Sequence, residues 1–174
     1  MAQVPEISRE HRDGSGTPRR AVCADLDALI ALEASSFASD HFRPRQWRYL
    51  LARPSAEVWV EEGVDTVAAS AASPSSVRAA MVILFRRGAR LARIYSLATA
   101  EPWRGQGLAG RLLALAERRA RARGCDRLGL EVREDNCGAL RLYEHHGFEV
   151  RRRLLAYYAD GSHGLRLEKK LSAD

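Results

Sequence analysis

The chain has 174 residues, of which 46% are hydrophobic and 29% are charged, and this favours one compact domain over two domains or a disordered chain. No apolar run approaches the roughly 20 residues that cross a bilayer, and the polar start does not resemble a signal peptide, so we expect a cytoplasmic protein without membrane contact. The net charge of +6 invites a nucleic-acid partner, but the basic residues are nearly all arginines spread along the chain without a nucleic-acid-binding motif, which argues against one.

In chain order, the pattern predicts a flexible tail over 1–17 and then a single domain over 18–174. Apolar residues at helical spacing predict a first helix, and Pro44 suits the first turn of a second helix, which Pro54 ends. The elements expected in this half are a strand at 20–23, helices at 25–37 and 44–52, and strands at 57–62 and 79–86, with an Ala/Ser-rich stretch at 68–76.

The second half of the chain predicts a hairpin turn at Arg87-Gly88 and then the longest helix, which follows a glycine-rich loop. This helix is amphipathic, with an apolar face and an arginine-rich one, and Gly124 stands where a left-handed C-cap belongs. The elements expected here are strands at 90–99, 127–132, 148–158 and 165–171, and helices at 108–123 and 137–146. The alternation of helices and strands along the chain indicates a mixed α/β (α+β) domain.

The glycine-rich loop has the composition of an anion-binding turn. It follows a strand, opens the longest helix and consists of Arg104, Gly105, Gln106, Gly107, Leu108, Ala109 and Gly110. The unpaired amides and the dipole of a helix N-terminus favour phosphate, the glycines permit positive φ, and Arg104 can fork onto pyrophosphate oxygens. The alternative is a tight turn that simply begins a helix.

A dinucleotide-binding site is a rival interpretation, because Gly105, Gly107 and Gly110 also match GxGxxG spacing. In that motif the first glycine directly follows an opening strand, whereas here Glu101-Pro102-Trp103-Arg104 intervenes past mid-chain. A Walker loop is excluded because no Gly-Lys-Ser or Gly-Lys-Thr follows. The cysteines Cys23, Cys125 and Cys137 lack zinc-site spacing, so we expect no metal.

The stretch from Tyr95 to Tyr158 resembles the GNAT superfamily of N-acetyltransferases. The loop Arg104 to Ala109 fits the family's cofactor pattern, and several further motifs are similar to bacterial ribosomal-protein alanine N-acetyltransferases: Leu130-Glu131-Val132-Arg133, Asn136, Ala139, Leu142-Tyr143-Glu144 and Gly147-Phe148. The resemblance implies the GNAT fold, with a single mixed, mostly antiparallel sheet of about six to seven strands and about four helices. It also implies acetyl-CoA as co-substrate.

The same resemblance implies roles for individual residues. Glu131 would be the general base, acting through water, and Tyr143 the general acid that protonates the CoA thiolate. Asn136 would contact the cofactor, and Leu97, Ala98 and Thr99 would act through backbone groups on pantetheine and the acetyl oxygen. The alternatives are a surface carboxylate paired with Arg133 or Arg127, a packed core tyrosine, and a helix cap.

The implied reaction is direct transfer of acetyl to an amine in a ternary complex, by a monomer or homodimer. A protein N-terminus is the leading acceptor, and a lysine side chain or a small amine comes second. Tyr157 and Tyr158, together with the 39–43 connector, are expected to rim the acceptor channel, or else the two tyrosines form an aromatic pair within a strand. A catalytically silent RNA- or ribosome-binding module is the alternative from another class.

Overall fold

The computed structural model describes residues 17–37, 41–63 and 76–172. Residues 1–16 of the expected tail, 39–40 of the connector and 68–75 of the Ala/Ser-rich stretch therefore lie outside the described residues. The strands are β1 (Arg19–Arg20), β2 (Ala56–Gly63), β3 (Ser76–Leu84), β4 (Leu91–Thr99), β5 (Arg127–Arg133), β6 (Glu149–Leu154) and β7 (Gly164–Lys170). The helices are α1 (Leu26–Ser36), α2 (Pro44–Ala52), α3 (Leu108–Ala122) and α4 (Cys137–His145), with 3₁₀ turns η1 (Cys23–Asp25) and η2 (Glu101–Trp103).

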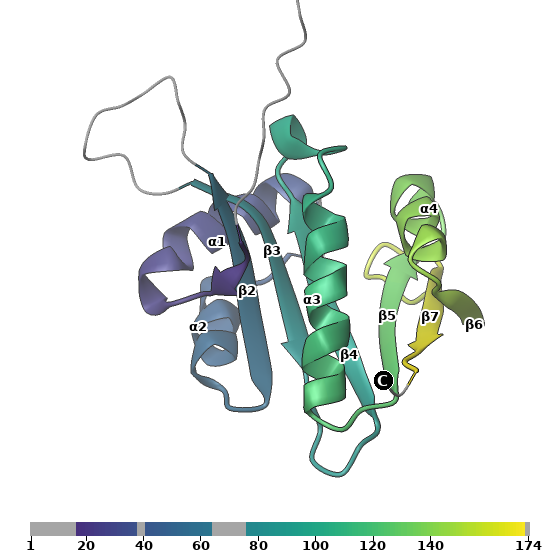
Figure 1. Cartoon of the computed structure of the whole chain (residues 1–174). Helices are drawn as coiled ribbons and strands as arrows, with labels where there is room; N and C mark the ends of the chain where they lie inside the picture. The colour runs from purple at the N-terminus through teal and green to yellow at the C-terminus, as the bar shows by residue number, and fades with distance from the viewer. Residues whose placement is uncertain (1–16, 38–40, 64–75, 173–174) are drawn as a thin grey trace, which may run out of the picture.

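The seven strands form one sheet in the order β1-β2-β3-β4-β5-β7-β6. Only β4 and β5 pair in parallel, and the other neighbours are antiparallel. Helices α1 and α2 cover β2 to β4 on one face, and α3 and α4 lie on the other face (Figure 1). The expected mixed, mostly antiparallel sheet with four helices is confirmed.

The strand before the last one ends well short of its predicted end. The prediction of a strand over 148–158 is wrong at its end, because β6 stops at Leu154 and both Tyr157 and Tyr158 lie in the connection to β7. Positive φ at Ala156 and Gly161 turns the chain there. The tyrosines form an edge-to-face pair, but in a loop rather than across a sheet.

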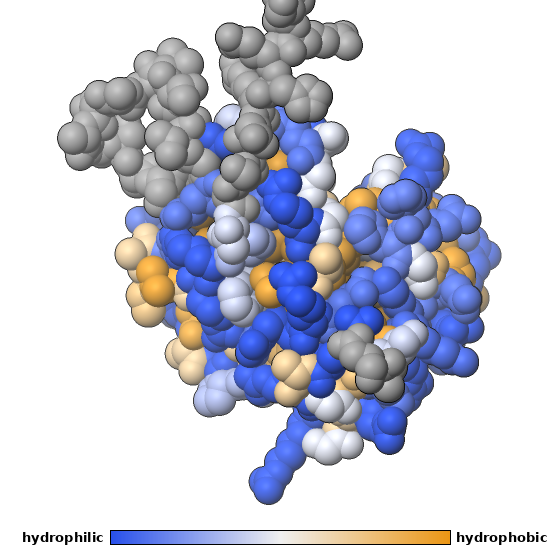
Figure 2. Space-filling model, in the orientation of Figure 1, coloured by the Kyte–Doolittle hydropathy of each residue, from blue (hydrophilic) through white to orange (hydrophobic). Residues whose placement is uncertain are grey.

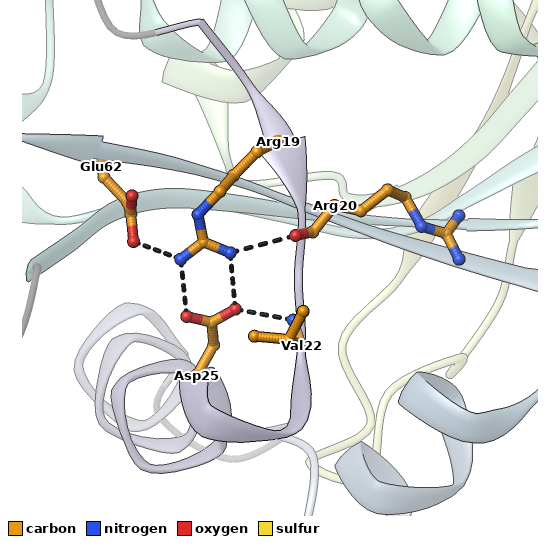
Figure 3. Close-up of polar contacts among 5 residues, drawn as sticks. All are labelled: Arg19, Arg20, Val22, Asp25 and Glu62. Carbon is orange, nitrogen blue, oxygen red and sulfur yellow. Dashed lines mark hydrogen bonds and ion pairs between the residues drawn. The ribbon is translucent and has the colours of Figure 1, made fainter.

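The first strand also differs from the prediction of 20–23, since β1 holds only Arg19 and Arg20. Figure 3 shows the cause: the carboxylate of Asp25 binds the guanidinium of Arg19 at 2.7 Å and accepts a hydrogen bond from the amide of Val22 at 2.7 Å. Arg19 also bonds Glu62 of β2. These contacts turn the chain into η1 and α1 instead of letting the strand continue.

Helix α3 is held to the sheet by buried ion pairs as well as by its apolar face. Glu57 and Glu61 of β2 are each about 1% exposed. Arg119 binds Glu57 through two hydrogen bonds of 2.8 and 2.9 Å, and Arg111 binds Glu61 at 3.0 and 2.6 Å. Burial opposes ionisation of Glu57, but bonds from Arg119, Trp59 and Arg123 outweigh it and lower its pKa to about 2. Several arginines of the polar face of α3 therefore serve the fold.

The sheet divides between β4 and β5, and this division positions the site. The two strands pair only from Leu91↔Arg127 to Arg93↔Gly129 and then separate. Just beyond Arg93, a β-bulge at Tyr95 interrupts the pairing of β4 with β3. Past the bulge, β4 has a partner on one side only, which leaves a V-shaped fork beside the N-terminus of α3.

Candidate active site

The glycine-rich loop forms a turn lined with free amides at the N-terminus of α3. Gly105 and Gly107 have φ of 75° and 79°, a conformation that glycine adopts without strain. The amide of Arg111 is the first to bond within the helix, to the carbonyl of Gly107. Among the described residues, no amide from Gly105 to Gly110 donates to another protein group. The loop therefore offers several donors and the positive end of a helix dipole to an anion.

The loop is fixed from behind by side-chain contacts that leave its backbone amides exposed. The guanidinium of Arg104 donates to the carbonyl of Thr99 at 3.2 Å, and the side-chain amide nitrogen of Gln106 donates to the carbonyl of Pro102 at 3.2 Å. The guanidinium of Arg78 lies 3.5 Å from the ring centroid of Trp103. Arg104 is exposed and keeps donors for a ligand.

Backbone groups of β4 face the fork at alternate residues. The amide of Ala100 donates to the carbonyl of Arg78 on β3, so the backbone of Ala98 also faces β3 in an antiparallel ladder. The N–H and C=O of Leu97 and Thr99 therefore point away from β3, toward the fork. Of the three residues expected to act through backbone groups, Leu97 has both groups available there and Thr99 has its N–H, since the carbonyl of Thr99 accepts from Arg104, while the groups of Ala98 belong to the sheet.

Glu131 lies in the middle of β5 and is held by two arginines. Its carboxylate is 2.6 Å from Arg93 of β4 and 3.0 Å from Arg166 of β7, and its side chain is 8% exposed. Of the two partners that the sequence suggested, Arg133 pairs with Asp160 and Asp135, and Arg127 pairs with Asp126 and Glu168. Two partners use only part of the four acceptor positions of a carboxylate, so lone pairs remain for a water or an amine.

Tyr143 lies on the buried face of α4 and packs edge-to-face on Phe148, with ring centroids 5.8 Å apart. Burial, reinforced by nearby Tyr158, raises the pKa of Tyr143 to about 12. The phenol is therefore protonated at neutral pH. Both the packing role and the capacity to donate a proton are compatible with this position.

Asn136 caps α4, because its side-chain oxygen accepts a hydrogen bond from the amide of Ala139 at 3.1 Å. This is the capping role weighed as the alternative to cofactor contact. Its amide nitrogen remains a donor, so the two roles are compatible.

The surface between α3 and α4 is notched, with hydrophobic residues in the notch (Figure 2). Residues 26–148 match the acetyltransferase (GNAT) family. The chain belongs to this family. Over 75 residues it is 37% identical to the N-alpha-acetyltransferase MAK3 of Arabidopsis thaliana, a segment that makes up 43% of this chain and 40% of that protein. The matched segment therefore spans less than half of that relative.

Solved GNAT structures share the fold. The ribosomal-protein-S18-alanine N-acetyltransferase of Escherichia coli superposes with a TM-score of 0.75 at 20% identity, covering 91% of this chain and 96% of that one. A NatC complex bound to Gag peptide and CoA gives a TM-score of 0.73 at 21% identity, covering 89% and 98%. At such identities the likeness concerns the fold alone. The expectations of family and fold are confirmed.

Sequence reasoning missed two polar residues beside the GNAT fork. Arg93 bonds Glu131 and also donates to the hydroxyl of Tyr157 at 3.3 Å. Glu33, on the apolar face of α1, is 4% exposed and accepts hydrogen bonds from Ser96 and from the amide of Phe42. A charge within an apolar strand, and another at a core position of a helix, were signals that could have found them.

The cavity of about 470 Å³ near the C-terminus of α3 is separate from this site. It is lined by residues including Phe85, Arg87, Arg123 and Cys125, and none of the residues expected to be functional lines it. A helix of 15 residues separates it from the loop by about 20 Å. The described residues contain no cluster that could hold a metal and no helix that could span a membrane.

Proposed function

We propose that this GNAT protein transfers the acetyl group of acetyl-CoA directly to an amine, and that the amine is the α-amino group of a protein N-terminus. The observation that carries the proposal is the row of unpartnered amides from Gly105 to Gly110 beside the fork between β4 and β5. Family membership and the N-alpha-acetyltransferases among its relatives support the acceptor.

In this proposal the loop binds the pyrophosphate of acetyl-CoA. The amides of residues 105–110 and the guanidinium of Arg104 donate to its oxygens, as the chemistry of a helix N-terminus favours. The backbone groups of Leu97 and the N–H of Thr99 hydrogen-bond along the pantetheine arm and orient the acetyl oxygen. The bound co-substrate supplies an activated thioester, and Asn136 contributes its free amide donor.

Glu131 accepts the proton that the amine must lose, through a water held against its carboxylate. An α-amino group has a pKa near 8, so at neutral pH most acceptor molecules are protonated and must lose a proton before the amine can attack. Tyr143 donates a proton to the departing thiolate, and its buried, neutral phenol supports this role. Tyr157 and Tyr158 flank the acceptor side of the site.

Calorimetric titration with acetyl-CoA, followed by assays of CoA release with short peptides of varied N-terminus, tests the proposal. We expect saturable binding of acetyl-CoA and turnover with free N-termini, but none with the same peptides blocked by N-terminal formylation. Turnover only with lysine side chains or small amines would show that the acceptor is one of these and not a protein N-terminus. If acetyl-CoA does not bind, the enzymatic function is refuted, and salt-sensitive RNA binding would then favour the non-catalytic alternative.

A further inference from the structure

Within the described residues, one face of the C-terminal half of the sheet has no helix over it. The apolar residues Leu130 and Val132 of β5 and Leu165 and Leu167 of β7 join the core beneath α3 and α4. The residues that alternate with these apolar ones along β5 and β7 point to the opposite face of the sheet. Because α1 and α2 cover β2 to β4, this opposite face of β5, β7 and β6 is left without helical cover.

Three charged residues lie directly opposite one another across that face. Glu131 of β5 pairs with Arg166 of β7, and Arg166 pairs with Arg152 of β6. Arg93 of β4 reaches Glu131 from the other side at 2.6 Å. We call Arg93, Glu131, Arg166 and Arg152 the charged row. It spans four strands, and it includes the carboxylate proposed as the base.

The charged row holds more positive charge than its single carboxylate balances. Arg93 and Arg166 share Glu131, and Arg152 has no ion-pair partner in the part of the chain that the structure describes. Most arginines around the row have carboxylates of their own: Arg151 with Glu149, Arg153 with Glu134, Arg133 with Asp160, and Arg127 with Glu168. Three guanidinium groups and one carboxylate leave the row with a net charge of +2.

We infer that the acceptor of this enzyme carries carboxylates just after its amine, and that Arg166 and Arg152 select them. The inference rests on the proposed function, because it places the amine at Glu131. Two strand spacings separate Glu131 from Arg152, about 10 Å, which is the span of about three extended residues. An acidic side chain at the second or third residue of the acceptor therefore lies over the unbalanced guanidinium groups. Such complementarity sets preference among acceptors.

Four peptides of equal length and identical first residue, with Glu, Gln, Lys or Ser at positions two and three, test the inference through kcat/KM at low and high salt. We expect the Glu peptide to exceed the Gln peptide by about three- to ten-fold at low salt, as for one or two partly exposed ion pairs, with the Lys peptide lowest. The preference should shrink at high salt.

Arg152 provides the decisive variants, because it is exposed and contacts none of the groups proposed for catalysis. Arg152→Gln should reduce the preference for Glu, and Arg152→Glu should shift it toward the Lys peptide. Arg151→Gln is the matched control, since Arg151 is the next residue on β6 but pairs with Glu149, and it should keep the wild-type preference.

The outcomes separate this inference from the proposed function. Turnover that does not depend on peptide charge, or a preference that Arg152→Glu leaves unchanged, overturns the inference alone. Acetyl-CoA binding without turnover of any peptide overturns the peptide acceptor and the inference together.

Discussion

The guanidinium of Arg93 lies 2.6 Å from the carboxylate of Glu131, and this ion pair joins β4 to β5 beside the last residue pair before the two strands separate. The same guanidinium reaches the hydroxyl of Tyr157 in the β6–β7 connection. One side chain therefore ties together three segments that surround the proposed reaction centre.

Replacing Arg93 should impair catalysis more than folding. Arg93→Gln removes the bonds that orient Glu131 and Tyr157, and we expect kcat/KM to fall about ten-fold, the effect of 1.4 kcal/mol on the barrier. Arg93→Lys keeps the charge but lacks the planar guanidinium that reaches two partners, so its kcat/KM should lie between those of the wild type and Arg93→Gln. Steady-state kinetics measure this, with Arg90→Gln as the control because Arg90 pairs with Asp126 away from the site. Equal losses in the Arg90 and Arg93 variants would contradict the assignment.

Glu131→Gln should shift the pH dependence of the reaction upward. Without the carboxylate, the rate follows the fraction of amine already neutral, so it should keep rising toward about pH 8 for an α-amino acceptor. The pH profile of kcat/KM measures the shift. Glu168→Gln is the matched control, because Glu168 lies on the same face of the adjacent strand and pairs with Arg127. An unaltered profile in the Glu131 variant would remove it from the role of base.

Tyr143→Phe should lower turnover without weakening acetyl-CoA binding. The variant keeps the ring that packs on Phe148 but loses the proton donor, and general acid catalysis typically contributes about 100-fold or more. Single-turnover rates and calorimetric affinity separate the two effects. Tyr49→Phe, at an exposed tyrosine of α2, serves as control. A purely structural Tyr143 would show lowered thermal stability with turnover intact.

Gly107→Ala should weaken acetyl-CoA binding. At φ 79° a side chain costs about 1–2 kcal/mol, and relaxing that strain moves the amides that would meet pyrophosphate. We expect about a ten-fold weaker Kd by calorimetry. Gly88→Ala is a matched control with φ 73° in the β3–β4 turn, so it should lose comparable stability and keep its affinity. Equal affinities in the two variants would speak against a phosphate-binding loop.

Glu33 should make stability fall as pH rises. Burial, opposed by hydrogen bonds from Ser96 and Phe42, raises its pKa from 4.5 to about 7. The folded state holds the proton of Glu33 more tightly than the unfolded chain does, and this contributes up to about 3 kcal/mol to the free energy of unfolding. The contribution is complete below about pH 4.5 and is lost as the pH rises through about 7.

Glu33→Gln should make the free energy of unfolding less dependent on pH in this range, since glutamine keeps a side-chain acceptor and does not ionise. Urea unfolding at pH 5, 6, 7 and 8 measures it. Asp27→Asn, at an exposed carboxylate of the same helix, should retain the wild-type slope. Parallel slopes in wild type and the Glu33 variant would contradict the expectation.

The sequence by itself determined the elements whose signals are local. Helix α2 begins at Pro44 and ends before Pro54 as predicted, and Gly124 has the positive φ expected after α3. The glycine-rich loop and the motifs up to Phe148 indicated the family, because phosphate-binding turns and helix caps depend on a few adjacent residues.

Only the tertiary structure decided which charges meet. Arg93, Glu131 and Arg166 lie far apart in the chain, and the strand order β4-β5-β7 brings them together. The burial of Glu33 and Glu57 likewise depends on α1 and α3 packing over the sheet. In a sequence with so many arginines, the sequence alone does not show which arginine pairs with which carboxylate. Strand order, register and helix placement choose their partners, and they do so through contacts between residues distant in sequence.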